Sequence, residues 1–192
     1  TESYSVKGLL QSITAQSGAV TALTYSTAET PTNVAPKPDL LTTVTDPNGR
    51  MLLFTYDNAS RISQVTLPDG GVLTYAYDSV GNLASVTYPD TGKRQYVYNE
   101  AGQTAGTSLP NAMTTLIDEK GVRFESTTYN AKGQAIASSF AGGVDSFTLD
   151  LTNRKVTTPL GQSTALTFTK VQGVAKVSGS SIPCGEACNQ PF

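Results

Sequence analysis

Acidic side chains are the residues of this chain whose type and spacing could support acid–base chemistry. The chain has no histidine, which removes Ser-His-Asp and Cys-His triads and most zinc sites, and it has no Gly-rich phosphate loop. An aspartate beside proline, tyrosine or glycine commonly caps its own backbone in a turn. We therefore predict no catalytic, cofactor-binding or metal-binding residue. The recurring aspartates, for which we predict turn roles, are Asp46, Asp57, Asp69, Asp78 and Asp90.

Two cysteines near the C-terminus could bond to each other. Cys184 and Cys188 are the only cysteines, and they lie four residues apart beside a proline and a glycine. Three interpretations stay open, namely a disulfide that closes a small loop, half of a metal site, or two free thiols. A metal would need further ligands that the chain lacks, whereas a disulfide would suit an exported protein.

A short phrase that recurs every 21 residues indicates which elements position these side chains. The step separates successive tyrosines and successive prolines, at Tyr56, Tyr77 and Tyr98 and at Pro47, Pro68 and Pro89. A period in this range indicates one supersecondary unit that stacks on its neighbours to bury its face. It favours a scaffold over an enzyme.

Each unit contains two turn phrases, Tyr-Asp-x-x-Gly and Pro-Asp-Gly. Asp or Asn caps its own backbone, Pro fixes φ, and Gly takes the left-handed position. The turn and ladder residues that define the repeat are Tyr56, Asp57, Tyr77, Asp78, Gly81, Tyr98, Asn99, Gly102, Tyr129, Asn130, Gly133, Pro47, Pro68 and Pro89. We expect hairpin turns at or beside Gly8, Gly49, Gly70, Gly81, Gly92, Gly102, Gly121 and Gly133, often with left-handed φ.

The segments between the turns are typical of strands. Leu73, Tyr75 and Tyr77 alternate with smaller residues, which predicts a half-buried strand. On the return strand, Leu83 and Val86 are three residues apart, so they can share a face only if a β-bulge lies between them. Two strands and two turns per unit make one hairpin. We predict an all-β fold of tandem antiparallel β-hairpin repeats, about 21 residues each, in one long twisted, curved sheet.

The register of the repeat divides the chain into segments of one repeat region, residues 1–192. We expect degenerate repeats over 1–25, a Pro-rich insertion over 26–40, regular repeats over 42–140, degenerate repeats over 141–178 and a Cys-containing tail over 179–192. A second insertion is expected at Leu109–Leu116, because Tyr98 and Tyr129 are 31 residues apart. We expect 26–40 and 178–192 to be the least ordered parts.

Composition excludes several classes of function. Net charge is −2 and no basic stripe is present, which argues against nucleic acid as a partner. No apolar run approaches the ~18 residues that a membrane span needs. The chain begins at Thr1 without a methionine and shows no signal peptide, so we expect it to be an internal piece of a longer protein.

The repeated phrase resembles the YD-repeat, or RHS-repeat, family. That family's unit is roughly Tyr-Asp-x-x-Gly-Arg-Leu, a Val-Thr-x-Pro-Asp-Gly phrase and Thr-x-Tyr-x-Tyr-Asp. The Tyr-Asp pair stands here at Tyr56-Asp57 and Tyr77-Asp78, and the arginine only at Arg61. At residues 98 and 129 asparagine follows the tyrosine and keeps a turn-forming side chain. The match is dense over 42–140.

The resemblance implies a non-enzymatic wall of a hollow β-shell. Such a shell encloses or presents a C-terminal toxin or effector domain of an exported or cell-surface bacterial protein of the RHS polymorphic-toxin type. The implied partners are neighbouring repeats of the same polypeptide and the enclosed toxin. Some family members are similar to self-cleaving shells with a paired Asp-Pro-x-Gly signature. Here Asp46-Pro47-Asn48-Gly49 occurs once, in register with the repeat, so we interpret it as a turn.

The main alternative is an extracellular module that binds carbohydrate or another cell surface. Aromatic side chains at strand positions could stack on sugars or form a cross-strand ladder that holds hairpins in register, and we favour the ladder. Exposed aromatics would favour glycan binding, and buried ones the wall. The aromatics concerned are Phe54, Tyr56, Tyr75, Tyr77, Tyr96 and Tyr98.

Overall fold

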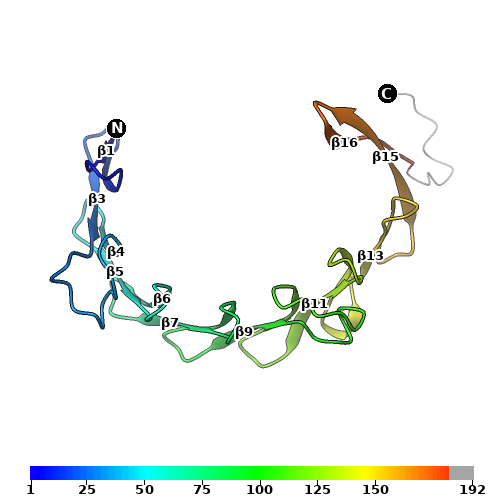
Figure 1. Ribbon diagram of the computed structural model, residues 1–192, viewed down its shortest axis with the longest axis horizontal. Coiled ribbons are helices and arrows are strands. Elements are labelled where there is room, and N and C mark those ends of the chain that lie inside the picture. Colours follow the sequence, from blue (N-terminus) through cyan, green and yellow to red (C-terminus); the bar gives the residue numbers. More distant parts are fainter. Residues whose placement is uncertain (182–192) are drawn as a thin grey trace. The chain divides into compact units, whose positions relative to one another are not determined.

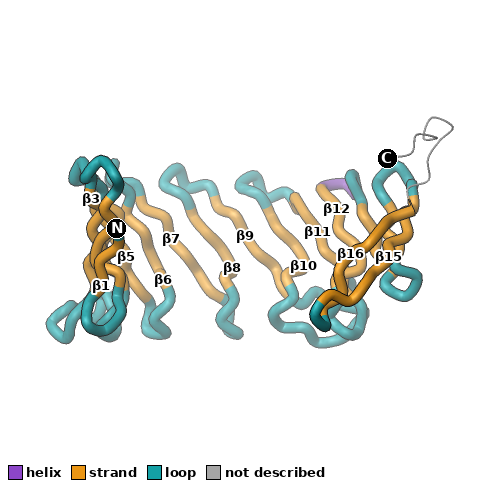
Figure 2. Tube along the Cα trace, turned by 90° about the horizontal axis from the view of Figure 1, so that it is seen from above, coloured by secondary structure: helices purple, strands orange, loops and turns teal. Residues whose placement is uncertain are grey.

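The protein is an all-β chain built as one open sheet of sixteen antiparallel strands (Figure 1). The computed structural model describes residues 1–181. Strand order in the sheet is sequence order, from β1 to β16, so each strand pairs with its neighbours in the chain. Turns alternate between the two ends of the strands (Figure 2). The described residues contain no α-helix and one 3-10 turn, η1 (Ala141–Gly143). The predicted fold of tandem hairpins is confirmed.

The chain divides into two compact units, Thr1–Arg94 and a second that begins at Gln95. The first contains β1 (Glu2–Tyr4), β2 (Leu10–Thr14), β3 (Val20–Tyr25), β4 (Leu41–Thr45), β5 (Met51–Tyr56), β6 (Ile62–Thr66), β7 (Val72–Tyr77), β8 (Leu83–Thr87) and the start of β9 (Lys93–Tyr98). The second continues with β10 (Met113–Ile117), β11 (Arg123–Tyr129), β12 (Ala135–Phe140), β13 (Phe147–Asp150), β14 (Lys155–Thr157), β15 (Ser163–Val171) and β16 (Val174–Ser181).

One five-residue turn joins most of the strands. In Asp78–Asn82 the amide of Asp78 donates to the Asn82 carbonyl at 2.9 Å, and the amide of Gly81 donates to the Asp78 carbonyl at 3.1 Å. The fourth residue, Gly81, has a left-handed φ of 104°. The same two bonds recur at 5–9, 15–19, 46–50, 57–61, 67–71, 88–92, 118–122, 130–134 and 158–162.

Glycine fills the fourth position of this turn in most copies, as its freedom at positive φ predicts. The expected glycines do lie in or beside turns, with one shift of register. In the turn at 88–92, Thr91 holds the left-handed position with φ of 70°, so Gly92 corresponds to Gly71 rather than to Gly70. Ser60 is the other non-glycine residue there, with φ of 63°. Gly102 lies in the longer loop between β9 and β10.

The predicted bulge is present on the return strand. Tyr77 pairs with Leu83 but Ala76 pairs with Ser85, so Ala84 is the extra residue. The bulge brings the partners of Tyr77 and Tyr75 to one face, as the three-residue spacing required. The same shift occurs at Tyr4, Tyr25, Tyr56, Tyr98 and Tyr129.

Apolar side chains gather on one face of the first unit. The register places Phe54, Val65 and Leu73 side by side across β5, β6 and β7, and places Tyr75 opposite Val86. This core is thin, because most of the row stays half-buried. Among the described hydrophobic residues, those less than a tenth exposed are Ala35, Val65 and Val86.

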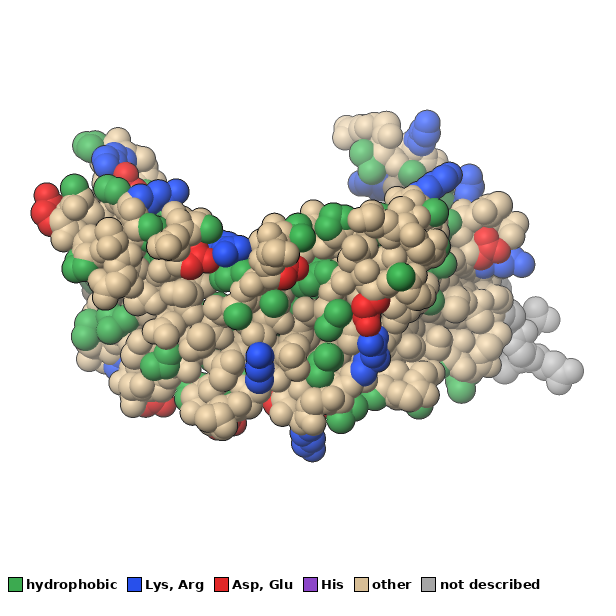
Figure 3. All heavy atoms as spheres, turned by 60° about the horizontal axis from the view of Figure 1, so that its bottom comes forward, with side chains coloured by type: hydrophobic (Ala, Val, Ile, Leu, Met, Phe, Trp, Pro, Cys, Tyr) green, Lys and Arg blue, Asp and Glu red, His purple; other side chains and the backbone are tan. Residues whose placement is uncertain are grey.

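The opposite face of the same strands is mixed, because polar side chains there stand beside the exposed Met51, Leu53 and Val72. Thr55, Gln64 and Thr74 follow one another across β5, β6 and β7. On the surface shown in Figure 3, charged side chains are spread among apolar and uncharged ones. The strands therefore follow only in part the apolar-in, polar-out alternation that an antiparallel sheet shows when one face is wet.

The insertion at 26–40 folds onto the first unit, and the expectation that it is poorly ordered is wrong. The Ser26 hydroxyl donates to the Lys37 carbonyl at 2.8 Å and accepts from the Leu40 amide at 2.9 Å. Ser26 and Ala35 are both 3% exposed. Backbone bonding and burial fix this loop despite its proline-rich composition, which signalled only that it is not a strand.

The second insertion lies earlier than the sequence indicated. It occupies the connection between Tyr98 and Met113, and Leu116 belongs to β10. The strand was missed because Met113–Ile117 carries the Thr-rich, weakly alternating sequence of a strand that is largely buried on both faces.

Candidate functional site: the seam between repeats

In four repeats a tyrosine hydroxyl fastens the repeat to the one before it. The Tyr77 hydroxyl donates to the carbonyl of Ile62 at 2.8 Å, and Ile62 is the residue that pairs with Tyr56 at the preceding bulge. A bulge interrupts ladder hydrogen bonding, so the hydroxyl supplies a donor where the ladder lacks one. Equivalent bonds run from Tyr25 to Leu10, from Tyr56 to Leu41 and from Tyr129 to Met113, at 2.9, 2.7 and 2.8 Å.

Three of these phenols stay protonated, and so able to donate, to a higher pH than a free tyrosine. Burial raises the pKa of Tyr56, Tyr77 and Tyr129 above the ordinary value. Tyr98 ends β9 at the equivalent place and pairs with Met113. The tyrosines of the repeat are therefore half-buried fasteners of the backbone.

The aspartate after the tyrosine organises the turn, as its position suggested. One oxygen of Asp57 accepts from the amides of Ala59 and Arg61, both at 2.9 Å. The other accepts from the Arg61 guanidinium, with a 2.7 Å ion pair. The backbone hydrogen bond from Arg61 is the main reason that the pKa of Asp57 lies below its usual value.

Other copies of the turn use the same chemistry with different partners. Asp78 accepts from three turn amides and from the side chain of Asn82, which lowers its pKa. Asn130 accepts from the amides of Lys132 and Gln134. Asn99 differs, because its oxygen accepts from the Leu109 amide at 2.6 Å across the long loop. Asparagine thus serves both as a turn cap and as a loop closure.

Arg61 reaches from its own turn to the next repeat. Its guanidinium carbon lies 4.1 Å from the centroid of the Tyr77 ring. A Cβ at Gly81 would lie 3.4 Å from an Arg61 nitrogen. Arg61 therefore links the two repeats: it forms an ion pair with Asp57 in its own turn and a cation–π contact with Tyr77 in the next repeat. The sequence revealed Arg61 only as a family-pattern residue; its contact with the following repeat was not predicted.

The prolines of the second turn phrase also serve the seam. Pro47, Pro68 and Pro89 each occupy the second position of a five-residue turn, where fixed φ is favourable. Pro89 also lies against the preceding repeat, since a Cβ built on Gly71 would lie 2.9 Å from its Cγ. A side chain at position 71 would have to displace that ring.

Both insertions supply a backbone acceptor to the tyrosine of the following repeat. The Tyr56 amide donates to the Val34 carbonyl at 2.9 Å, and the Tyr129 amide donates to the Gln103 carbonyl at 2.6 Å. The Thr128 hydroxyl adds a 2.9 Å bond to the side chain of Gln103. The two insertions thus support the following repeat through the same kind of backbone hydrogen bond, although their sequences differ.

The second unit contains a polar cluster that sequence analysis missed. The carboxylate of Glu100 accepts from the hydroxyls of Thr114 and Thr115, at 2.7 and 2.6 Å, and pairs with Arg123 at 2.6 Å. Arg123 also donates to Thr115. Both threonines are at most 1% exposed. Hydrogen bonding by Arg123, then by the threonines, lowers the pKa of Glu100 to about 2. Such a contact over 23 residues leaves no local signal in the sequence.

The carboxylates of the seam take part in structural bonding. Asp46 is tied to the amides of Asn48 and Arg50 and to the Arg50 guanidinium, which lowers its pKa. Within residues 1–181, no three His, Cys, Asp or Glu residues are grouped to hold a metal ion. No helix in that range is long and apolar enough to cross a membrane. Cys184 and Cys188 lie outside the described residues.

Hairpins added in sequence order and fastened by tyrosines define a β-hairpin repeat scaffold. The model of the teneurin YD-shell family matches residues 1–176, and the chain belongs to that family. This confirms the resemblance to YD, or RHS, repeats. No curated protein matches the sequence closely enough to count as a relative.

Solved structures show the same fold in much larger proteins. The TcdB2–TccC3–Cdc42 crystal structure has a TM-score of 0.56 and 14% identity, covering 92% of this chain and 10% of that one. TcdB2–TccC3 without its hypervariable C-terminal region gives 0.55 and 14%, with the same coverage. At this identity the likeness concerns the fold. The chain spans 10% of the length of these structures.

Proposed function

We propose that this chain is a stretch of the wall of a hollow β-shell, and that the wall encloses or presents a C-terminal toxin or effector domain of an exported protein. The seam is the observation that carries the proposal. Backbone pairing joins successive hairpins, and in four repeats a tyrosine hydroxyl fastens the hairpin to the preceding one, so the sheet can grow hairpin by hairpin without a second layer. That is a suitable construction for a thin, extended wall.

The partners of such a wall are, first, further repeats of the same polypeptide. In the described sheet β1 and β16 each have one neighbouring strand, and an open strand edge is a template for another strand. One solved structure of the same fold is described as TcdB2–TccC3 without its hypervariable C-terminal region, so the complete protein has such a region beyond the shared fold. This supports a downstream domain as the second partner. Export, and a bacterial source, rest on the family resemblance.

Two observations favour a non-enzymatic wall over the alternatives. The turn carboxylates accept hydrogen bonds from backbone amides and neighbouring side chains, so their oxygens have a structural role in the turns. The repeat tyrosines are half-buried, and their hydroxyls bond to backbone carbonyls, which leaves less of each ring for stacking on a sugar. Carbohydrate or cell-surface binding is therefore the weaker proposal.

Limited proteolysis of the parent polypeptide tests enclosure. With intact repeats, a downstream domain should resist added protease. Deleting the two hairpins from β5 to β8 should expose it, while a urea-unfolded sample gives the fully cleaved control. A downstream domain that is equally sensitive with and without these repeats would contradict the wall.

Prolonged incubation of the purified chain tests the absence of self-cleavage. We expect the chain to stay intact at neutral pH, because Asp46 is held as a turn anion. Mass spectrometry would detect a cut between Asp46 and Pro47. A cut that Asp46→Asn abolishes would instead support a self-processing protein.

A further inference from the structure

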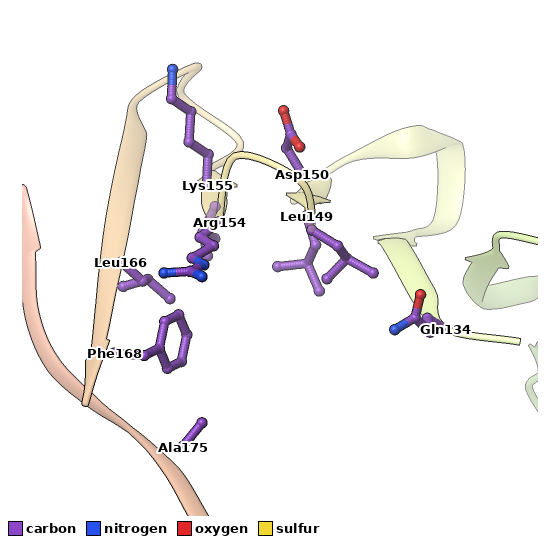
Figure 4. Close-up of a pocket in the computed structure, with 10 residues that line it drawn as sticks. Gln134, Leu149, Asp150, Arg154, Lys155, Leu166, Phe168 and Ala175 are labelled. Carbon is purple, nitrogen blue, oxygen red and sulfur yellow. The ribbon is translucent and has the colours of Figure 1, made fainter. Parts of the chain in front are cut away.

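A cavity in the second unit combines uncovered apolar side chains with an arginine that makes no ion pair within residues 1–181. It has a volume of about 370 Å³ and lies among β13, β14, β15 and the start of β16. Leu149, Leu151 and Phe168 line it and remain 38%, 44% and 40% exposed. In Figure 4 the Arg154 guanidinium lies beside Leu166 and Phe168. This volume suits one large side chain rather than a folded domain.

Of the two cations at this cavity, Arg154 has no anionic partner within residues 1–181, whereas Lys155 stands opposite Asp150 in the register of β13 and β14 and the two charges attract each other. Arg154 lies 5.8 Å from the Phe168 ring centroid but makes no ion pair in that range, and neither does Lys155. The nearby carboxylate of Asp150 accepts hydrogen bonds from the Thr152 and Asn153 amides and from the Asn153 side chain, and it makes no ion pair with Arg154. Figure 4 shows Asp150 pointing away from Phe168.

The wider charge distribution agrees with this local excess. Although the whole chain has a net charge of −2, residues 141–181 contain four cations and two anions, which is a net charge of +2. The cations are Arg154, Lys155, Lys170 and Lys176, and the anions are Asp145 and Asp150.

The backbone of Arg154 is also unusual. Its φ of 54° lies in the left-handed region that favours glycine. Arg154 thus holds a strained backbone conformation while its guanidinium lies beside an apolar cavity. Strain of this kind at a charged residue supports a functional role.

We propose that this cavity binds an extended peptide segment in which a large apolar side chain stands beside a carboxylate. The apolar side chain would pack against Leu149 and Phe168, and the carboxylate would pair with Arg154, whose planar guanidinium suits such recognition. Lys155 would add charge at the rim. This proposal does not depend on the shell, because binding is measurable on the isolated chain.

Peptide titration followed by NMR of the labelled chain tests the proposal. The probe is acetyl-Gly-Glu-Phe-Glu-Gly-amide, and its controls replace both glutamates by glutamine or the phenylalanine by alanine. We expect the probe to shift amide signals of residues 149–156 and 166–168, and each control peptide to bind at least tenfold more weakly. Equal binding by the glutamine peptide would overturn the role of charge.

Two charge-matched double variants locate the site. Arg154→Gln with Lys155→Gln should lower affinity at least tenfold, whereas Lys170→Gln with Lys176→Gln, which removes the same charge outside the cavity, should change it less than threefold. Unchanged spectra of the unbound variants show that they are folded. Equal losses in the two variants, or no probe binding to the parent chain, would overturn the proposal.

Discussion

Thr91 is the residue at which the turn chemistry is least well matched to the backbone. It is β-branched and holds φ of 70°, where eight other copies of the turn have glycine. We expect Thr91→Gly to stabilise the chain by about 1 kcal/mol, because a side chain in the left-handed region costs about that much. The reciprocal change, Gly70→Thr, should destabilise by ~1–2 kcal/mol, although a Cβ there meets nothing within 4 Å.

Urea unfolding of both variants measures these changes. Thr74→Gly is the control, because residue 74 lies within β7 and glycine in a strand interior is unfavourable. It should destabilise. If Thr91→Gly also destabilised, the left-handed position would not be the source of strain.

Ionisation of Glu100 should make the free energy of unfolding depend on pH. Its pKa is about 2 in the folded chain and near the ordinary value of ~4.3 in the unfolded chain. Because the folded value is the lower one, the contribution is complete above ~4.3 and is lost as pH falls toward 2. Its size is roughly 2 kcal/mol after allowing for the half-exposed Arg123.

Comparison of the parent chain with Glu100→Gln isolates this contribution. The difference in unfolding free energy should be largest at pH 6 and should shrink as the pH approaches 2.5. Glu125→Gln on β11, whose carboxylate makes no hydrogen bond within the described residues, should change stability little. A difference for Glu100→Gln that is independent of pH would show that the carboxylate charge is not what matters.

Between neighbouring hairpins, the tyrosine hydroxyl adds a side-chain bond to the backbone pairing that joins them. Tyr77→Phe removes the bond to the Ile62 carbonyl and leaves that acceptor without its donor. We expect a loss of about 1–2 kcal/mol. Tyr75→Phe is a matched control, because Tyr75 lies on the same strand and its hydroxyl makes no hydrogen bond within the described residues. Denaturant unfolding should show a change below ~0.5 kcal/mol for the control. Equal losses would mean that the hydroxyl bond does not fasten the seam.

The hairpin could be predicted from the sequence because its features recur along the chain. The step of 21, the turn glycines and the spacing of Leu83 and Val86 recur in most of the regular units, and the bulge follows from that spacing. The contacts that join units were not predictable in the same way. The bond from Tyr77 to Ile62 depends on strand register, which the spacing of tyrosines alone does not define.

Features that occur once were missed for a different physical reason. Glu100 meets Arg123 only after two turns of the chain bring β10 and β11 beside the loop. Likewise, Val34 in the first insertion bonds to Tyr56 through its backbone, so its side-chain type carries no signal. Composition marked these segments as loops, and their packing came from the register of the strands around them.

At the scale of the whole molecule, a sheet extended hairpin by hairpin should differ in stability along its length. Strands in the regular repeats have a bonded neighbour on both sides and contain the two buried valines, Val65 and Val86. In β16, by contrast, every residue is exposed, and the strand has one paired neighbour among the described strands. Local opening should therefore cost least at the ends, because fewer contacts must be broken there.

Hydrogen exchange followed by mass spectrometry measures this gradient. We expect protection to be strongest in peptides covering Thr74–Tyr77 and Gln95–Tyr98 and to fall toward β1 and β16. The first insertion should be protected at its buried Ser26 and at the Tyr56 amide that bonds to Val34. Because open edges recruit strands, raising the protein concentration should increase protection at β1 and β16 before it affects β7. Uniform protection from end to end, unchanged by concentration in a strictly monomeric chain, would indicate a self-contained β-domain and would weaken the shell-wall proposal.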